Sequence, residues 1–91
     1  MAVEVRIPTV FRKFTDGSSN VELEPGTIAD LVDQLEARYP GMREQLLTSE
    51  GQLHRFVNVY VNDEDARYLE KLDTKVADGD TVSLLPSVAG G

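Results

Sequence analysis

The sequence contains no cysteine and a single histidine, His54. Without cysteine the chain has no disulfide, no thiolate metal site, no cysteine nucleophile and no side-chain persulfide. A single histidine also excludes a two-histidine zinc site and a histidine-based triad built from this chain alone. Any sulfur chemistry in which the protein takes part must therefore use an atom other than a side-chain thiol.

Motifs that mark enzymes and metal proteins are also missing. The sequence has no glycine-rich phosphate loop, no GxSxG elbow and no lysine-bearing Walker motif. The acidic residues 63–65 lack the glycine and the terminal glutamate of a calcium loop, so we interpret them as a solvated turn. A surface role is expected for His54, which has no visible orienting partner. We expect that the chain is not an enzyme and binds no metal or cofactor itself.

Long apolar runs and an excess of basic side chains are absent as well. No run reaches the roughly 18 residues of a membrane span, and residues 1–6 mix charged and apolar side chains, unlike a secretion signal. Nine lysines and arginines stand against sixteen aspartates and glutamates, a net charge of −7. This charge disfavours nucleic acid and anionic lipid and favours partners with basic grooves. We expect a cytoplasmic protein that is a monomer when alone.

The 91 residues suffice for one domain, and its first half predicts two strands and a helix. Residues 3–7 and 21–23 alternate apolar with charged side chains, which indicates two antiparallel strands joined by a long loop. Residues 28–35 repeat apolar side chains at helical spacing, directly after Thr27, and Asp30 stands where a capping box needs an acceptor. The main helix therefore begins after Thr27.

The second half predicts further strands and little helix. Residues 56–61 are the strongest strand signal, and residues 81–85 alternate after a turn at 78–80. Weaker patterns indicate a short helical turn at 42–47 and a short returning strand at 66–68. We predict an α+β fold, a mixed sheet of four to five strands covered on one face by one main helix, with the first and last strands paired at its centre.

The alternation also predicts which side chains face inward. We expect the core to contain Val3, Val5, Ile7, Val57, Val59, Val61, Val82 and Leu84 from the sheet and Ile28, Leu31, Val32 and Leu35 from the helix. Phe56, Tyr60 and Leu85, with Arg6 beside them, should then face solvent. We call these four residues the docking patch. Exposed apolar side chains with a polar rim often mark an interface, although cross-strand pairs that only stabilise a solvated face would look the same.

The chain ends in small side chains, Pro86, Ser87, Val88, Ala89, Gly90 and Gly91. Pro86 has no N–H for a sheet ladder, so we expect residues 1–85 to form the domain and residues 86–91 a flexible tail. Six extended residues reach up to about 20 Å, and two glycines without Cβ atoms can thread a narrow channel. A frayed end or a cloning scar is one interpretation; a substrate for another protein's active site is the other.

The second interpretation predicts chemistry at the terminal carboxylate. An ionised carboxylate is a poor electrophile and needs activation. Joining Gly91 to AMP provides a leaving group, after which a sulfur nucleophile on a partner could displace AMP and leave a thiocarboxylate. Sulfur would then be carried on the main chain, in agreement with the lack of cysteine.

Several segments together resemble the ubiquitin-like sulfur carriers of the MoaD/ThiS family. They are Ile-Pro-Thr at 7–9, Leu-His-Arg-Phe-Val-Asn-Val-Tyr-Val-Asn-Asp-Glu-Asp at 53–65, Ala-Asp-Gly-Asp at 77–80 and Pro-Ser-Val-Ala-Gly-Gly at 86–91. The middle segment most resembles the members that serve cysteine biosynthesis. Ser87 and residues 69–72 depart from that pattern, which bears on the choice of partner. The resemblance covers nearly the whole chain and implies a β-grasp fold.

The resemblance further implies partners and their cofactors. An E1-like adenylyltransferase and sulfurtransferase of the MoeB/MoeZ type would activate Gly91 with ATP and magnesium. A PLP-dependent cysteine synthase would use the thiocarboxylate on O-phosphoserine-derived aminoacrylate, and a JAMM-type zinc metalloprotease would release cysteine. Acceptors in molybdopterin, thiamine or thiosugar and natural-product pathways stay open. So do two other functions, a ubiquitin-like modifier joined to proteins through Gly91 and a passive interaction module.

Overall fold

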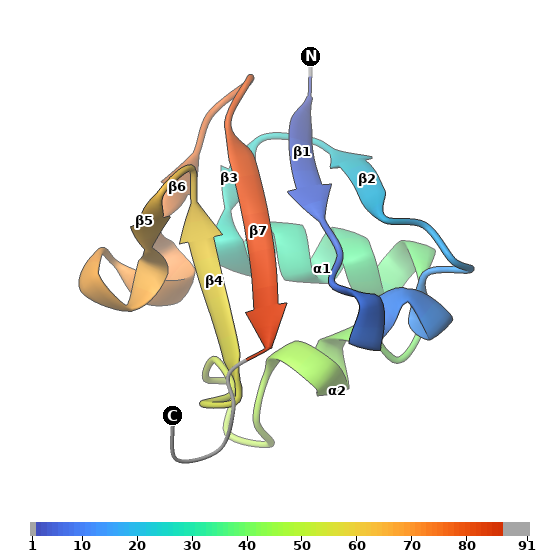
Figure 1. Ribbon diagram of the computed structural model, residues 1–91. Coiled ribbons are helices and arrows are strands. Elements are labelled where there is room, and N and C mark those ends of the chain that lie inside the picture. Colours follow the sequence, from blue (N-terminus) through green and yellow to red (C-terminus); the bar gives the residue numbers. More distant parts are fainter. Residues whose placement is uncertain (1, 87–91) are drawn as a thin grey trace.

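The computed structural model describes residues 2–86, and Figure 1 shows their arrangement. The elements in chain order are β1 (Val3–Arg6), η1 (Thr9–Phe14), β2 (Asn20–Leu23), β3 (Gly26–Thr27), α1 (Ile28–Arg38), α2 (Met42–Leu46), β4 (Val57–Val61), β5 (Glu64–Asp65), η2 (Ala66–Tyr68), η3 (Lys71–Asp73), β6 (Lys75–Val76) and β7 (Thr81–Pro86), where η marks a 3₁₀ helix. Within this part of the chain, no helix combines the length and apolar character needed to cross a membrane.

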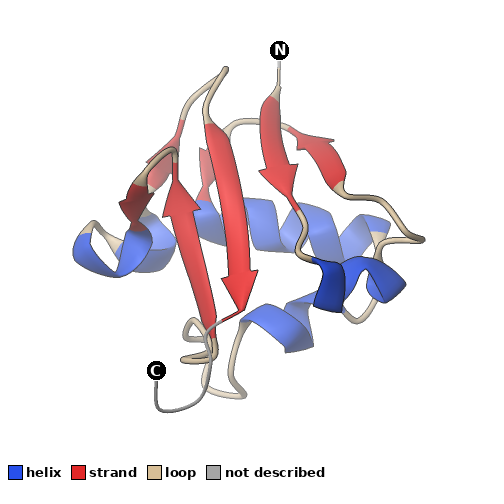
Figure 2. Ribbon diagram, viewed as in Figure 1, coloured by secondary structure: helices blue, strands red, loops and turns tan. Residues whose placement is uncertain are grey.

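Five strands form a mixed sheet in the order β2-β1-β7-β4-β5. The central strand β7 runs parallel to β1 and antiparallel to β4, whereas β1–β2 and β4–β5 are antiparallel. The predicted pairing of the first and last strands at the sheet centre is confirmed. Helix α1 crosses one face of the sheet, and within residues 2–86 no helix covers the other face (Figure 2).

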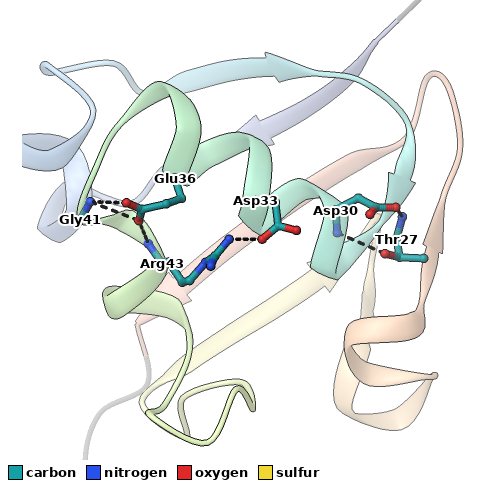
Figure 3. Close-up of polar contacts among 6 residues, drawn as sticks. All are labelled: Thr27, Asp30, Asp33, Glu36, Gly41 and Arg43. Atoms are coloured by element: carbon teal, nitrogen blue, oxygen red, sulfur yellow. Dashed lines mark hydrogen bonds and ion pairs between the residues drawn. The ribbon is translucent and has the colours of Figure 1, made fainter.

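The predicted capping box starts α1. The Thr27 hydroxyl accepts from the Asp30 amide at 3.2 Å, and the Asp30 carboxylate accepts from the Thr27 amide at 3.0 Å, which satisfies two amides that the first helical turn leaves free. Figure 3 shows this pair at the start of the helix. The hydrophobic side of α1 then packs on the sheet, and all twelve residues predicted for the core are buried.

Beyond the C-terminal end of α1, one carboxylate organises the connection to α2. Glu36 accepts hydrogen bonds from the amides of Arg43 at 2.9 Å and Gly41 at 3.2 Å, and Arg43 forms an ion pair with Asp33 (Figure 3). The two amides, Arg43 first and Gly41 second, hold the pKa of Glu36 below its usual value of 4.5. Gly41 has φ +105°, a left-handed conformation that glycine adopts without steric cost.

One local prediction needs correction here, and two features of the structure were not predicted. Residues 66–68 form the 3₁₀ helix η2, and the returning strand is instead β5 at Glu64–Asp65. Asn62, with φ +57°, closes a turn tight enough for pairing to resume at Glu64, and the fully buried Ala66 then faces the core. The long loop between β1 and β2 contains η1, whose Phe11 is buried, and a two-stranded sheet of β3 and β6 was not predicted.

Candidate functional site

Strand β7 connects the core to the C-terminal end of the chain. Val82 and Leu84 are buried against the helix side, while Leu85 on the opposite face is 45% exposed. Pro86 is the last described residue and lies opposite Val57 of β4. The predicted tail residues Ser87, Val88, Ala89, Gly90 and Gly91 lie outside the described residues. The sheet therefore fixes the point from which they start.

Two rows of the open sheet face contain three of the four docking-patch residues. Ser83 of β7 has Arg6 as its partner on β1 and Tyr60 as its partner on β4, so these three residues form one row across the sheet. Leu85, paired with Asn58, stands in the next row toward the end of β7. The Arg6 side chain is 64% exposed, and its Nε lies 3.9 Å from a carboxylate oxygen of Glu4. The predicted outward orientation of Arg6 and Leu85 agrees with their exposure, while Tyr60 is half-buried.

Phe56 belongs to a turn and not to the strand in which it was predicted. Strand β4 begins at Val57, and Phe56, which is 41% exposed, stands before it. The ring centroid lies 5.2 Å from that of His54 and 5.2 Å from the guanidinium carbon of Arg55. The His54 Nδ1 accepts from the Phe56 amide at 3.4 Å. Phe56 thus stands in a turn in which the side chains of His54 and Arg55 lie beside its ring.

A shallow hollow of about 380 Å³ adjoins the end of β7 and was not predicted. Pro86, Phe56 and His54 line one part of it, and Val10 of η1 and Gln45 of α2 line another. Val10 is one of the most exposed apolar residues, at 53%. The sequence pattern around Val10 has no clear period, so only the fold brings η1 next to the docking patch. The exposed apolar residues Phe56 and Val10 therefore both border this hollow beside Pro86.

Charged residues in the described part of the chain do not form a metal site. Among residues 2–86, no three histidine, aspartate or glutamate side chains are grouped so that they could hold a metal ion. Arg12 donates to the Ile7 carbonyl at 3.1 Å, and the Lys13 ammonium lies 5.4 Å from the Phe14 ring. Among residues 2–86, the candidate site therefore consists of the docking patch and the end of β7.

Comparison with known proteins agrees with this arrangement. The sulfur carrier protein CysO of Mycobacterium tuberculosis is 50% identical, with both chains covered completely. Small archaeal modifier protein 3 of Haloferax volcanii is 34% identical, again over the full length of both. A chain in the crystal structure of the Amycolatopsis orientalis BexX/CysO complex superposes with a TM-score of 0.91 at 48% identity, covering 99% of this chain and 100% of that one.

These structural similarities identify the fold as the ubiquitin-like β-grasp, as predicted. The ThiS family model matches residues 5–91, which include the whole sheet except the start of β1. The chain therefore belongs to the ThiS family and is a homologue of the sulfur carrier CysO.

Proposed function

We propose that the protein is a sulfur carrier whose Gly91 carboxylate is adenylated and then converted to a thiocarboxylate. The observation that carries the proposal is the 50% identity to CysO over the whole of both chains. The family match also extends through residue 91. The carrier is a covalently modified cosubstrate, and the catalytic groups belong to its partners.

The proposed reaction starts with the Gly91 carboxylate attacking the α-phosphorus of ATP, which forms an acyl-adenylate and releases pyrophosphate. Magnesium on the activating enzyme would neutralise phosphate charge. Hydrosulfide can then attack the acyl carbon: the carbon–sulfur bond forms, AMP leaves with the carbon–oxygen electron pair, and a proton is lost. Gly90 and Gly91, which lack Cβ atoms, leave that acyl carbon open to attack.

The test uses the purified chain with ATP, magnesium, an E1-like enzyme of the MoeB/MoeZ type and a sulfide source. Intact-mass spectrometry should show an increase equal to sulfur minus oxygen, and omission of sulfide should leave the acyl-adenylate. A chain that lacks Gly91 is the matched control and should keep its mass. An unmodified wild-type chain under conditions that modify an authentic CysO would overturn the proposal.

We further propose that the docking patch binds the activating enzyme. Phe56 and Leu85 expose apolar surface close to Pro86, and residues 87–91 span at most about 18 Å beyond it. An enzyme that contacts the patch can therefore reach Gly91 with the same active-site channel, to which Pro86, Ser87, Val88 and Ala89 would bind. The existence of a BexX/CysO complex supports the idea that this family docks on other proteins.

Serine substitution at Phe56 and Tyr60 tests the docking proposal. The double variant should raise KM for the carrier by about tenfold or more, because interface aromatics commonly contribute more than 1 kcal/mol, while the fold stays intact. Tyr68→Ser is the matched control, since Tyr68 is an aromatic side chain that is 88% exposed outside the patch. An unchanged KM in the double variant favours the interpretation that these residues are only cross-strand pairs.

We propose that the carrier donates its sulfur to cysteine synthesis from O-phosphoserine, because the chain is 50% identical to CysO over its full length. A PLP-dependent synthase would receive the sulfur, an acyl shift would give a carrier–cysteine adduct, and a JAMM-type zinc metalloprotease would release cysteine. The thiocarboxylated chain, incubated with such a synthase and O-phosphoserine, should gain the mass of the cysteine adduct. A carrier that transfers sulfur only to a molybdopterin, thiamine or thiosugar precursor would place it in another pathway.

The similarity to small archaeal modifier protein 3 favours one second candidate, a modifier joined to lysines through Gly91. Both functions share the acyl-adenylate, and they differ in the nucleophile that displaces AMP. An epitope-tagged chain expressed in its own host distinguishes them. High-mass conjugates that survive reductant and denaturant and disappear on deletion of Gly91 would support the modifier.

A further inference from the structure

Three backbone carbonyls in the turn that displays Phe56 converge on one arginine. The Nη2 atom of Arg67 lies 2.9 Å from the Val57 oxygen, 3.0 Å from the Arg55 oxygen and 3.3 Å from the His54 oxygen. Arg67 belongs to η2, so these contacts join segments that are 10 to 13 residues apart. Hydrogen bonds with a charged donor are stronger than those between neutral groups. The guanidinium therefore ties the turn at several points.

Arg67 is itself held in place by the elements around it. Its amide donates to the Asp65 carboxylate at 2.9 Å, which caps the start of η2. Asp65 in turn lies in β5 opposite Tyr60 of β4. The Arg67 side chain thus extends from the far end of the β4–β5 hairpin back to the first residue of β4. Both ends of the connection are fixed by the sheet.

The turn at 54–57 also makes backbone hydrogen bonds that do not involve Arg67. The His54 amide donates to the Leu46 carbonyl at 2.8 Å, whereas the bonds from the Val57 amide to the His54 carbonyl and from the Phe56 amide to His54 Nδ1 stay within the turn. Arg67 thus supplies three hydrogen bonds that join the backbone of this turn to a residue ten or more positions away. The exposed ring of Phe56 depends on this backbone for its position.

We propose that Arg67 is a positioning residue of the docking patch, which holds the 54–57 turn in the conformation that presents Phe56 to the activating enzyme. Arg67 acts through Phe56 and makes no contact with the partner itself. The inference rests on the proposed function, in particular on the docking role of Phe56. It predicts that loss of the guanidinium weakens docking beyond what a general loss of stability would do.

The first experiment compares three variants in steady-state adenylation by the activating enzyme. Arg67→Met keeps the aliphatic stem and removes the donors; it should raise KM for the carrier by about tenfold and leave kcat unchanged. Arg67→Lys keeps the charge, and an ammonium can reach some of the carbonyls, so its KM should fall between those of the wild type and Arg67→Met. Should Arg67→Met fail to fold, Arg67→Lys carries the comparison, and a wild-type KM in that variant overturns the proposal.

The matched control is Arg38→Met. Arg38 also donates from its guanidinium to a backbone carbonyl, that of Glu22 at 3.1 Å, but Glu22 lies in β2 at the opposite edge of the sheet. Arg38→Met should therefore lower the melting temperature without changing KM. Equal effects of Arg38→Met and Arg67→Met on KM would mean that stability alone is responsible, and the proposal would be wrong.

A double variant separates this inference from the proposed function. Once Phe56→Ser has removed the ring, adding Arg67→Met should raise KM little further. In the single variant Arg67→Met, amide hydrogen exchange at Val57 should be faster than in the wild type. Additive effects of the two substitutions, or unchanged exchange, would overturn the positioning role. A wild-type chain that is never adenylated would instead overturn the proposed function, and the docking role of Arg67 with it.

Discussion

Adjacent leucines in β7 allow stability and docking to be tested separately. Leu84 is 4% exposed and Leu85 is 45% exposed, on opposite faces of the same strand. Replacing a buried leucine with alanine costs about 2 to 5 kcal/mol, since a cavity adds to the lost transfer free energy. We therefore expect Leu84→Ala to lower the free energy of unfolding by about 3 kcal/mol, where the whole free energy of unfolding of a small domain is roughly 5 to 15 kcal/mol. Leu85→Ala loses only the part that is buried and leaves no cavity, about 1 kcal/mol or less.

Urea unfolding followed by circular dichroism measures both free energies, and adenylation kinetics at a temperature where both variants are folded measures docking. We expect Leu84→Ala to keep the wild-type KM and Leu85→Ala to raise it by about tenfold. Equal losses of stability would contradict the face assignment of β7. An unchanged KM for Leu85→Ala would contradict the docking role of the open sheet face, whatever the stability data show.

Three further predictions address the helix, its C-terminal connection and the surface charge. Thr27→Ala removes the side-chain acceptor for the Asp30 amide and should lower the free energy of unfolding by about 1 kcal/mol, measured in urea. The amide partners of Glu36 lower the pKa of its carboxyl from 4.5 in the folded state. The carboxylate therefore stabilises the fold above pH 4.5, and this contribution is lost as pH falls through the folded-state pKa. The difference in stability between the wild type and Glu36→Gln should shrink in acid, and a constant difference would contradict the prediction. If the net charge of −7 steers the carrier toward a basic groove, kcat/KM for adenylation should fall as salt is raised while kcat stays constant, and a flat salt profile would exclude steering.

Periodicity predicted the sheet and the main helix because each has one buried face. Val3 and Val5 alternate with charged residues in β1, and Leu31 and Leu35 recur one helical turn apart in α1, so burial leaves a direct mark on the sequence. The capping box could be predicted for a similar reason, since its two partners, Thr27 and Asp30, lie within one helical turn. The sequence was sufficient to predict an element where the interactions that form it are local.

The errors arose where the cause is not local. The return after β4 was predicted at 66–68, but a left-handed Asn62 lets the chain turn earlier, and burial of Ala66 then favours a 3₁₀ helix. Phe56 was assigned to the strand because it continues the run of aromatic and β-branched residues. Three carbonyls around it are instead bound by Arg67, 10 to 13 residues further along, and no local pattern reveals such a contact.

The position of β7 explains how the reactive chain end that we propose is compatible with a small domain. An edge strand that leads to a partner's active site would separate from the sheet when only one ladder breaks, whereas β7 pairs with β1 on one side and β4 on the other. Val82 and Leu84 also anchor it to the core. A partner that pulls on the segment after Pro86 therefore works against two ladders and the hydrophobic core together. A central strand would let the proposed sulfur carrier offer Gly91 to an activating enzyme without unfolding the proposed docking patch.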